Sequence, residues 1–154
     1  IAIAAQAIIG RYLGAGDTRT VRDLIRLMVR WGMWFGVILA VIFFATRRAI
    51  PWVFTTDQAV RDLVTTVLIV VAVLLPLNGL VFVLDGVLIG AGDTRYLALA
   101  GTVVTCAYLP LAIWVDLTDK SLVWLWAAYG VSMFGRGVVL WVRAKGVQWM
   151  RLGV

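Results

Sequence analysis

The stretch Gly-Ala-Gly-Asp-Thr-Arg occurs at residues 14–19 and again, letter for letter, at residues 90–95. A further glycine stands four positions before each copy, so residues 10–19 and 86–95 share the pattern G-x-x-x-G-A-G-D-T-R. Internal repeats set the architecture of a chain. The repeat distance of 76 residues is too long for a solenoid unit. It fits a pair of membrane-spanning helices with their connections.

The composition indicates an integral membrane protein. The 154 residues are 63% apolar and 14% charged, and they include no histidine; their mean hydropathy is +0.99. A soluble domain carries about 25% charged residues, and one of this size cannot bury so much apolar surface in a single core. The net charge of +6 therefore points to basic membrane ends and not to a nucleic-acid partner. The single Cys106 lies in an apolar run, which predicts a small packing residue and no disulfide framework.

Uncharged runs predict one partial and four complete spanning helices, because a span takes about 20 apolar residues. The runs cover residues 31–46, 63–84, 96–115 and 121–142, and only Arg136 interrupts the last. Residues 1–10 are apolar but too few to span, so we expect them to be the last half of a helix. With flanking residues, the helices are expected near 1–13, 18–48, 59–90, 94–115 and 121–144. The expected fold class is all-α, a polytopic membrane helix bundle.

We expect both copies of the motif to form structural turns. Their glycines follow an apolar run, and glycine is preferred just past the C-terminus of a helix. The aspartate of each copy is then placed to cap the next helix through its free backbone N–H groups. The glycine pairs before each turn have the G-x-x-x-G spacing that lets helix backbones approach closely. The turn residues are Gly10, Gly14, Gly16 and Asp17 in the first copy and Gly86, Gly90, Gly92 and Asp93 in the second.

Four arginines follow the first copy at spacings of three, four and four residues, which places them on one face of a helix. A basic amphipathic segment of this kind suits a membrane surface with anionic headgroups. A second interpretation is a solvated beginning of the next spanning helix, and the two are compatible. The four residues are Arg19, Arg22, Arg26 and Arg30.

The distribution of basic residues predicts the orientation of the chain. Alternate connections fall on opposite sides of the membrane. Nine basic residues, from Arg11 to Arg151, belong to the side of the two motif turns, and four belong to the other side. Basic residues are in excess on the cytoplasmic side. We therefore expect the motif turns and the C-terminus to be cytoplasmic in a bacterial-type inner (plasma) membrane.

Two ionisable residues fall inside the predicted spans, Asp85 and Arg136. Each lies seven or eight residues from its cytoplasmic end, so both should sit at nearly the same depth, roughly 10 Å inside. We predict that they are neighbours, because pairing lowers the free energy of burying both charges. The pair then has two possible roles. It is either a fixed ion pair that locks the helix ends, or a cytoplasmic gate whose carboxylate titrates during transport.

A second candidate lies deeper, where Pro76 interrupts the run at residues 63–84 and Asn78 follows it. Proline removes a backbone hydrogen bond and is expected to kink the helix. Broken helices near the membrane centre are where transporters place binding sites. The alternative is a structural kink that packs against other helices. Pro76, Asn78, Asp85 and Arg136 are thus the candidates for a substrate or ion pathway.

Enzymatic chemistry is not indicated. The chain has no histidine, no cysteine pair and no hydrolase-type serine motif, and the glycine-rich turns lack the lysine and the preceding strand of a phosphate loop. We expect no catalytic residue, no metal site and no cofactor.

Three stretches together resemble the multidrug and toxic compound extrusion (MATE) family: A-Q-A-I-I-G-R-Y-L-G-A-G-D at residues 5–17, V-F-T-T-D at 53–57 and L-D-G-V-L-I-G-A-G-D-T-R at 84–95. The last one is most similar to the DinF-like branch. The resemblance implies twelve helices in two lobes of six, with this chain covering the end of the eighth helix through the twelfth. The N-terminal lobe would then be missing from the sequence.

The resemblance also implies a function. Such a protein exports amphipathic, often cationic organic compounds in exchange for protons or sodium ions, by alternating access between its lobes. The ion-binding aspartates of the DinF-like branch belong to the absent lobe. Another branch uses a carboxylate deeper in the tenth helix, at a position that falls near Asn78 here, so Asp85 does not inherit that role. The expected partners are membrane lipid, small organic substrates and the missing lobe.

Two other functions remain open: a lipid-linked precursor flippase of the same superfamily, and a small non-transporting membrane scaffold. A flippase needs a strongly cationic central cavity to hold phosphates, whereas the spans contain one arginine, Arg136, near an end. Because a site between two lobes needs both of them, we expect the chain alone not to transport.

Overall fold

A computed structural model describes residues 2–118, 120–146 and 148–150, so Ile1 and Arg151 lie outside the described residues. The described part is all helical: α1 (Ala2–Gly14), α2 (Thr18–Thr46), α3 (Ala49–Phe54), α4 (Gln58–Gly90), α5 (Thr94–Leu117) and α6 (Leu122–Lys145). Within these ranges α2, α4, α5 and α6 are long and apolar enough to cross a membrane. The predicted fold class, a polytopic bundle of membrane helices, is confirmed.

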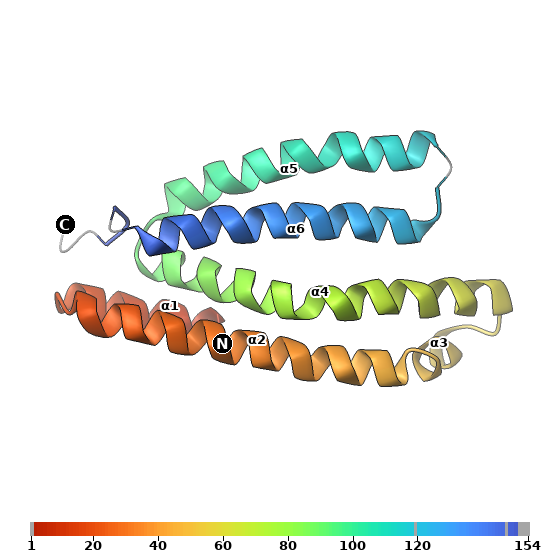
Figure 1. Ribbon diagram of the computed structural model, residues 1–154, viewed down its shortest axis with the longest axis horizontal. Helices are drawn as coiled ribbons and strands as arrows, with labels where there is room; N and C mark the ends of the chain where they lie inside the picture. Colours follow the sequence, from red (N-terminus) through yellow and green to blue (C-terminus); the bar gives the residue numbers. More distant parts are fainter. Residues whose placement is uncertain (1, 119, 147, 151–154) are drawn as a thin grey trace.

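Helix α4 is the centre of the bundle. It packs against α1, α2 and α6, while α5 lies outside α6 (Figure 1). The second half of α4 is apolar apart from Asn78 and Asp85, and Val81, Leu84, Val87 and Leu88 are fully buried. A helix that is apolar all round belongs in the interior. The helix continues without interruption through Pro76, so the proline neither ends nor splits it.

Glycine brings α1 and α4 into backbone contact. A Cβ on Gly90 would lie 2.9 Å from the Cα of Gln6 and closer still to its carbonyl oxygen, and one on Gly86 would meet the backbone of Ala2 in the same way. The predicted G-x-x-x-G packing is therefore confirmed for the second copy. In the first copy Gly10 faces the carbonyl oxygen of Gly90, but Gly14 has nothing within 4 Å, so its predicted packing role is wrong.

The contact between α2 and α4 uses a glycine pair that the sequence analysis did not single out. A Cβ on Gly32 would lie 2.9 Å from the carbonyl oxygen of Gly79, and one on Gly36 would lie 2.7 Å from the Cα of Pro76. The backbone beside the proline is thus covered directly by α2. Close approach of this kind needs residues without a side chain.

The two motif turns have the same backbone structure. In the first, the N–H of Gly16 donates to the carbonyl of Leu13 and that of Asp17 to Tyr12; the second copy repeats both bonds one period later. This is the Schellman pattern that closes a helix C-terminus. Gly16 and Gly92 have φ angles of 78° and 75°, the left-handed region that favours glycine. Both turns lie at one end of the bundle, which agrees with the prediction that they share a side (Figure 1).

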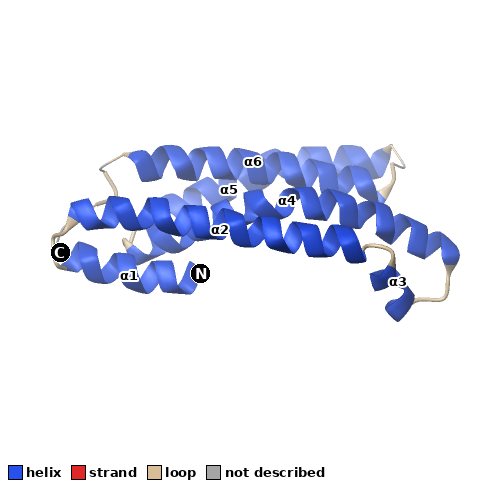
Figure 2. Cartoon of the chain, turned by 60° about the horizontal axis from the view of Figure 1, so that its bottom comes forward, coloured by secondary structure: helices blue, strands red, loops and turns tan. Residues whose placement is uncertain are grey.

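The opposite end differs from expectation in one respect. Residues 49–54, which fall between the helices expected near 18–48 and 59–90, form the short helix α3, which lies at the end of the bundle between α2 and α4 (Figure 2). Pro51 lies within its first turn, where a missing N–H has no helical partner to lose. Pro51 is buried, whereas Trp52, Val53 and Phe54 are exposed.

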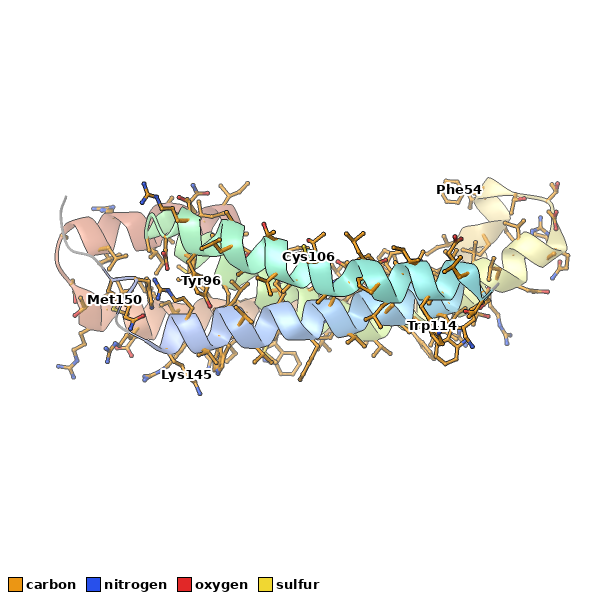
Figure 3. All side chains as sticks on the ribbon, turned by 90° about the horizontal axis from the view of Figure 1, so that it is seen from above. Phe54, Tyr96, Cys106, Trp114, Lys145 and Met150 are labelled. Carbon is orange, nitrogen blue, oxygen red and sulfur yellow. The ribbon has the colours of Figure 1, made fainter. Side chains whose placement is uncertain are left out.

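Much of the apolar surface faces outward. Leu99, Val103 and Ile113 of α5 are among the exposed side chains, and Cys106, expected to be a packing residue, is also exposed on this helix (Figure 3). Only α6 covers α5 extensively. An outward face of this kind is what lipid or further protein covers.

Candidate functional site

Asp85 and Arg136 are direct neighbours, as predicted from their depth. The Arg136 Nη2 donates to Asp85 Oδ1 at 2.9 Å, and the two side chains are about one-fifth exposed, 20% and 23%. Gly101 of α5 leaves room for the guanidinium, because a Cβ there would be 3.3 Å from Arg136 Nη1. One ion pair therefore joins α4 and α6 beside α5. Its partners satisfy one another, which lowers the free energy of placing both charges in a membrane.

A second ion pair lies two turns nearer the motif end. The Arg143 Nε donates to Asp93 Oδ2 at 2.8 Å, and the guanidinium also contacts Gln148 Oε1 at 2.8 Å and the Tyr96 ring at 4.5 Å. The Tyr96 hydroxyl donates to the Val139 carbonyl at 3.2 Å. These contacts fasten the second motif turn, the start of α5 and the residues after α6 to one arginine.

The equivalent aspartates of the two copies therefore have different partners. Asp17 caps α2, since its Oδ1 accepts from the Thr20 N–H at 3.0 Å. Hydrogen bonds from Thr20 hold the pKa of Asp17 below its ordinary value. Asp93 stands at the same position before α5 but makes no capping bond. The prediction that Asp93 caps the next helix is wrong, because its carboxylate is directed to Arg143 instead.

Asn78 lies at a cavity of about 540 Å³ between α4, α5 and α6. Three aromatic side chains form much of the wall: Tyr108 from α5, and Trp126 and Tyr129 from α6. The rings of Trp126 and Tyr129 meet edge to face, with their centroids 5.7 Å apart. The Asn78 side-chain oxygen is buried and has no hydrogen-bond partner. A buried polar atom without a partner is unusual in a folded protein, so this oxygen keeps a hydrogen-bonding capacity that no described residue uses.

The predicted candidates thus separate into two levels. Asp85 follows Asn78 by seven residues, roughly 10 Å along α4, and neither Asp85 nor Arg136 lines the Asn78 cavity. Pro76 does not line it either and instead faces Gly36 of α2. Within the described residues no group of three or more acidic, cysteine or histidine side chains gathers as a metal site would require.

The arginines at the start of α2 lie as the spacing predicts. Arg19, Arg22, Arg26 and Arg30 are all exposed. Val21, Ile25 and Val29 on the other face are buried in the core. The helix is therefore amphipathic over its first three turns, which leaves the membrane-surface interpretation in place for these four residues.

Comparison with known proteins identifies the family. Residues 1–116, three-quarters of the chain, match the family described as MatE. The chain belongs to the MatE family. It is 33% identical to an uncharacterized transporter of Schizosaccharomyces pombe over 147 residues, which cover 92% of this chain and 27% of that protein. No solved structure matches the chain.

Two plant proteins of Arabidopsis thaliana are also similar. Protein DETOXIFICATION 44, chloroplastic, is 31% identical over 104 residues, 68% of this chain and 20% of that protein. Protein DETOXIFICATION 42 is 30% identical over 138 residues, 90% of this chain and 27% of that protein. The chain therefore spans about a quarter of the length of the curated relatives it matches. Together with its four apolar helices, membership of the MatE family makes it a multi-pass membrane protein.

Some site features could not be found by inspecting single segments. The Asp93–Arg143 pair was missed because capping preference is read locally and Arg143 is 50 residues away. The spacing held a signal. Asp85 and Arg136 are 51 residues apart, and Asp93 and Arg143 are 50 residues apart. Because α4 and α6 run parallel, two pairs with nearly equal separations are expected to meet in the same way. The aromatic cavity was missed because three helices must be placed before Tyr108 and Tyr129 can be seen to face Asn78.

Proposed function

We propose that the chain forms part of the C-terminal lobe of a secondary transporter that exports amphipathic, often cationic organic compounds. Transport would be antiport with protons or sodium ions, by alternating access between two lobes. The family supports this proposal, as do relatives whose names describe detoxification. The form of the second motif, L-D-G-V-L-I-G-A-G-D-T-R, favours the DinF-like branch.

The observation that carries the proposal is the cavity at Asn78. Its volume of about 540 Å³ suits an organic molecule, since ligand pockets measure roughly 300–1,000 Å³. The aromatic rings of Trp126, Tyr108 and Tyr129 line the cavity and would attract organic cations. The Asn78 oxygen, buried and unpaired, would accept a hydrogen bond from a ligand N–H once its side chain turns toward the cavity. No carboxylate lines the cavity. We therefore place substrate contact at this level, and coupling-ion binding outside it.

The charge distribution supports an orientation. Basic residues gather at the end that carries both motif turns, and the excess is expected on the cytoplasmic side. We propose a cell inner (plasma) membrane location with both turns and residues 148–150 facing the cytoplasm. Asp85 and Arg136 then lie close to the cytoplasmic end of the bundle.

Binding of ethidium, a fluorescent aromatic cation, tests the cavity in the purified 154-residue chain. Asn78→Leu removes the acceptor, and we expect roughly a tenfold lower affinity for ethidium, because one lost hydrogen bond in a buried site is worth about 1–2 kcal/mol. Thr102→Val is the matched control, since it also exchanges a polar for an apolar side chain but lies on α5 outside the cavity lining. Equal ethidium binding by Asn78→Leu and the parent chain would rule the cavity out as the substrate site.

Transport itself is tested in two steps. The chain alone, expressed in a strain that lacks its own efflux pumps, should give no ethidium efflux, because alternating access needs both lobes even where one lobe binds the compound. Reading the coding DNA before residue 1 tests the architecture: we expect an open frame for about seven more spanning helices and another glycine–aspartate turn. An upstream stop codon, or efflux by the chain alone, contradicts the two-lobe proposal.

A further inference from the structure

A groove runs between α2 and α6 over the surface of α4, on a part of the bundle that the Asn78 cavity does not use. Its inner section, about 330 Å³, is entirely apolar. Leu77 and Leu80 of α4 line its floor, together with Gly137 of α6. Met33 and Trp141 line it from α2 and α6, and their side chains are 44% and 37% exposed. The groove is thus open along its length and is floored by a helix that spans the membrane.

The outer section of the groove, about 220 Å³, is basic. Arg22 and Arg26 line it from α2 and Lys145 from α6, while Ile25 and Ala144 also line it. The Lys145 ammonium lies 5.2 Å from the centre of the Trp141 ring. Three basic side chains from two helices therefore border one small space. Figure 3 shows Lys145 at the same end of the bundle as Tyr96 and Met150, which is the motif end.

Trp141 lines both sections, so they adjoin at its side chain. On α2 the lining runs from Arg22 to Met33, and on the antiparallel α6 it runs from Lys145 back to Phe134. Each of these stretches covers eleven residue steps, about 16 Å of helix. The groove is thus basic at the motif end of the bundle and apolar toward the membrane centre, with the amphipathic Trp141 side chain between the two parts.

We propose that this groove binds one anionic phospholipid of the leaflet at the motif end. The phosphate would lie among Arg22, Arg26 and Lys145, and an acyl chain would follow the apolar section over Leu77 and Leu80. Basic residues near a membrane surface attract anionic lipids, and their apolar stems extend from the hydrocarbon region to the headgroups. An aromatic ring at the headgroup level is a typical interfacial anchor.

The charge pattern selects this occupant. An apolar helix would fit the inner section but would leave the three positive charges of the outer section without a partner. An organic cation would also fit the inner section but would be repelled by those charges. A free phosphate would fit the outer section and leave the apolar one empty. The carboxylate of Asp23 contacts Arg26 at 3.2 Å, but Asp23 is two-thirds exposed and does not line the groove. The balance inside the groove therefore favours an amphiphile with a negative head.

The test is native mass spectrometry of the 154-residue chain in detergent with added phosphatidylglycerol, phosphatidylcholine or inorganic phosphate. We expect one phosphatidylglycerol per chain, bound more tightly than phosphatidylcholine, and no competition by inorganic phosphate. Arg22→Gln with Arg26→Gln should weaken phosphatidylglycerol binding roughly 25-fold, because each basic residue near the surface contributes about a factor of five. The control, Arg19→Gln with Arg30→Gln, removes the same charge from the same helix outside the groove, and should change binding less than threefold.

A second variant tests the apolar section and does not depend on the arginines. Val138→Trp narrows the groove from α6, where Val138 is 48% exposed and tolerates a larger side chain. It should weaken both lipids alike. Equal losses in the two arginine pairs would show diffuse surface attraction, and competition by inorganic phosphate would show an anion site; either result overturns the proposal. Helix content by circular dichroism, unchanged in each variant, confirms that binding is compared between folded chains.

Discussion

Alanine substitution at two equivalent motif glycines should have opposite effects on stability. Gly14 and Gly90 are each the first glycine of G-A-G-D-T-R and each is the last residue of its helix. A Cβ at Gly14 meets nothing within 4 Å, whereas one at Gly90 lies 2.9 Å from the Cα of Gln6. Ordinary Cβ contacts begin at 3.4 Å. Helix α1 must therefore move away from α4 by at least about half an ångström in Gly90→Ala, and further to clear the Gln6 carbonyl oxygen.

The magnitudes follow from these distances. Overpacking of a close interface costs about 1–3 kcal/mol, so Gly90→Ala should lower the free energy of unfolding by that amount. Gly14→Ala should leave it unchanged or raise it by up to about 1 kcal/mol, since alanine is the better helix former. The measurement is reversible unfolding of the chain in dodecylmaltoside micelles with added dodecylsulfate, followed by circular dichroism at 222 nm.

An internal control comes from the third residue of each motif. Gly16 and Gly92 both have positive φ angles and open space around a Cβ, so alanine should lower stability by about 1–2 kcal/mol at either position. The packing argument fails if Gly90→Ala is as stable as Gly14→Ala. The backbone argument fails if the Gly16 and Gly92 variants differ from one another by as much as the Gly14 and Gly90 variants do.

Three further predictions concern the charged residues. Arg136→Met should lower the free energy of unfolding by about 3 kcal/mol, because Asp85 is left partly buried and unpaired. Adding Asp85→Leu should restore most of this loss. Additive effects of the two substitutions would show that the pair does not interact. In the longer transporter, Asp85→Asn with unchanged coupling and substrate range would leave the fixed ion pair as the only role. The lowered pKa of Asp17 predicts stability that is present above the unfolded-state value of about 4 and lost as pH falls through the lower folded-state value. In Asp17→Ala the midpoint of thermal unfolding should depend less on pH in this acidic range. The same pH dependence in the variant and the parent chain would show that the cap contributes nothing to stability.

The elements that could be predicted from sequence are those fixed by solvent transfer and local backbone preference. Runs without charge gave the four long helices, because charged residues rarely enter the membrane interior. The glycines at positive φ were indicated by their place after an apolar run. The Asp85–Arg136 contact followed from counting residues to the membrane end, since both charges needed a partner at one depth.

What the sequence could not predict depends on neighbours far along the chain. Asp17 and Asp93 stand in the same hexapeptide, but the residue three positions later is Thr20 in one copy and Tyr96 in the other, and only Asp93 has an arginine, Arg143, beside it. Gly14 and Gly90 differ in the same way, because only Gly90 faces another helix. The short α3 has too few residues to show a period. The Asn78 cavity needs the packing of three helices, which no single pattern encodes.

The glycine contacts have a mechanical consequence for the bundle. On one side of α4, the interfaces with α1 and α2 combine close main-chain contacts at glycines with buried apolar side chains. Among the described residues no side-chain hydrogen bond or ion pair links α4 to α1. On the other side, two ion pairs join α6 to α4 and to the turn that follows it, and the Leu74 side chain packs against Gly130. Ion pairs therefore hold α6 to α4 and to the turn after it, whereas α1 is held to α4 by close packing alone. The position of α1 on α4 thus depends on the fit of two surfaces, and that of α6 on directional polar contacts.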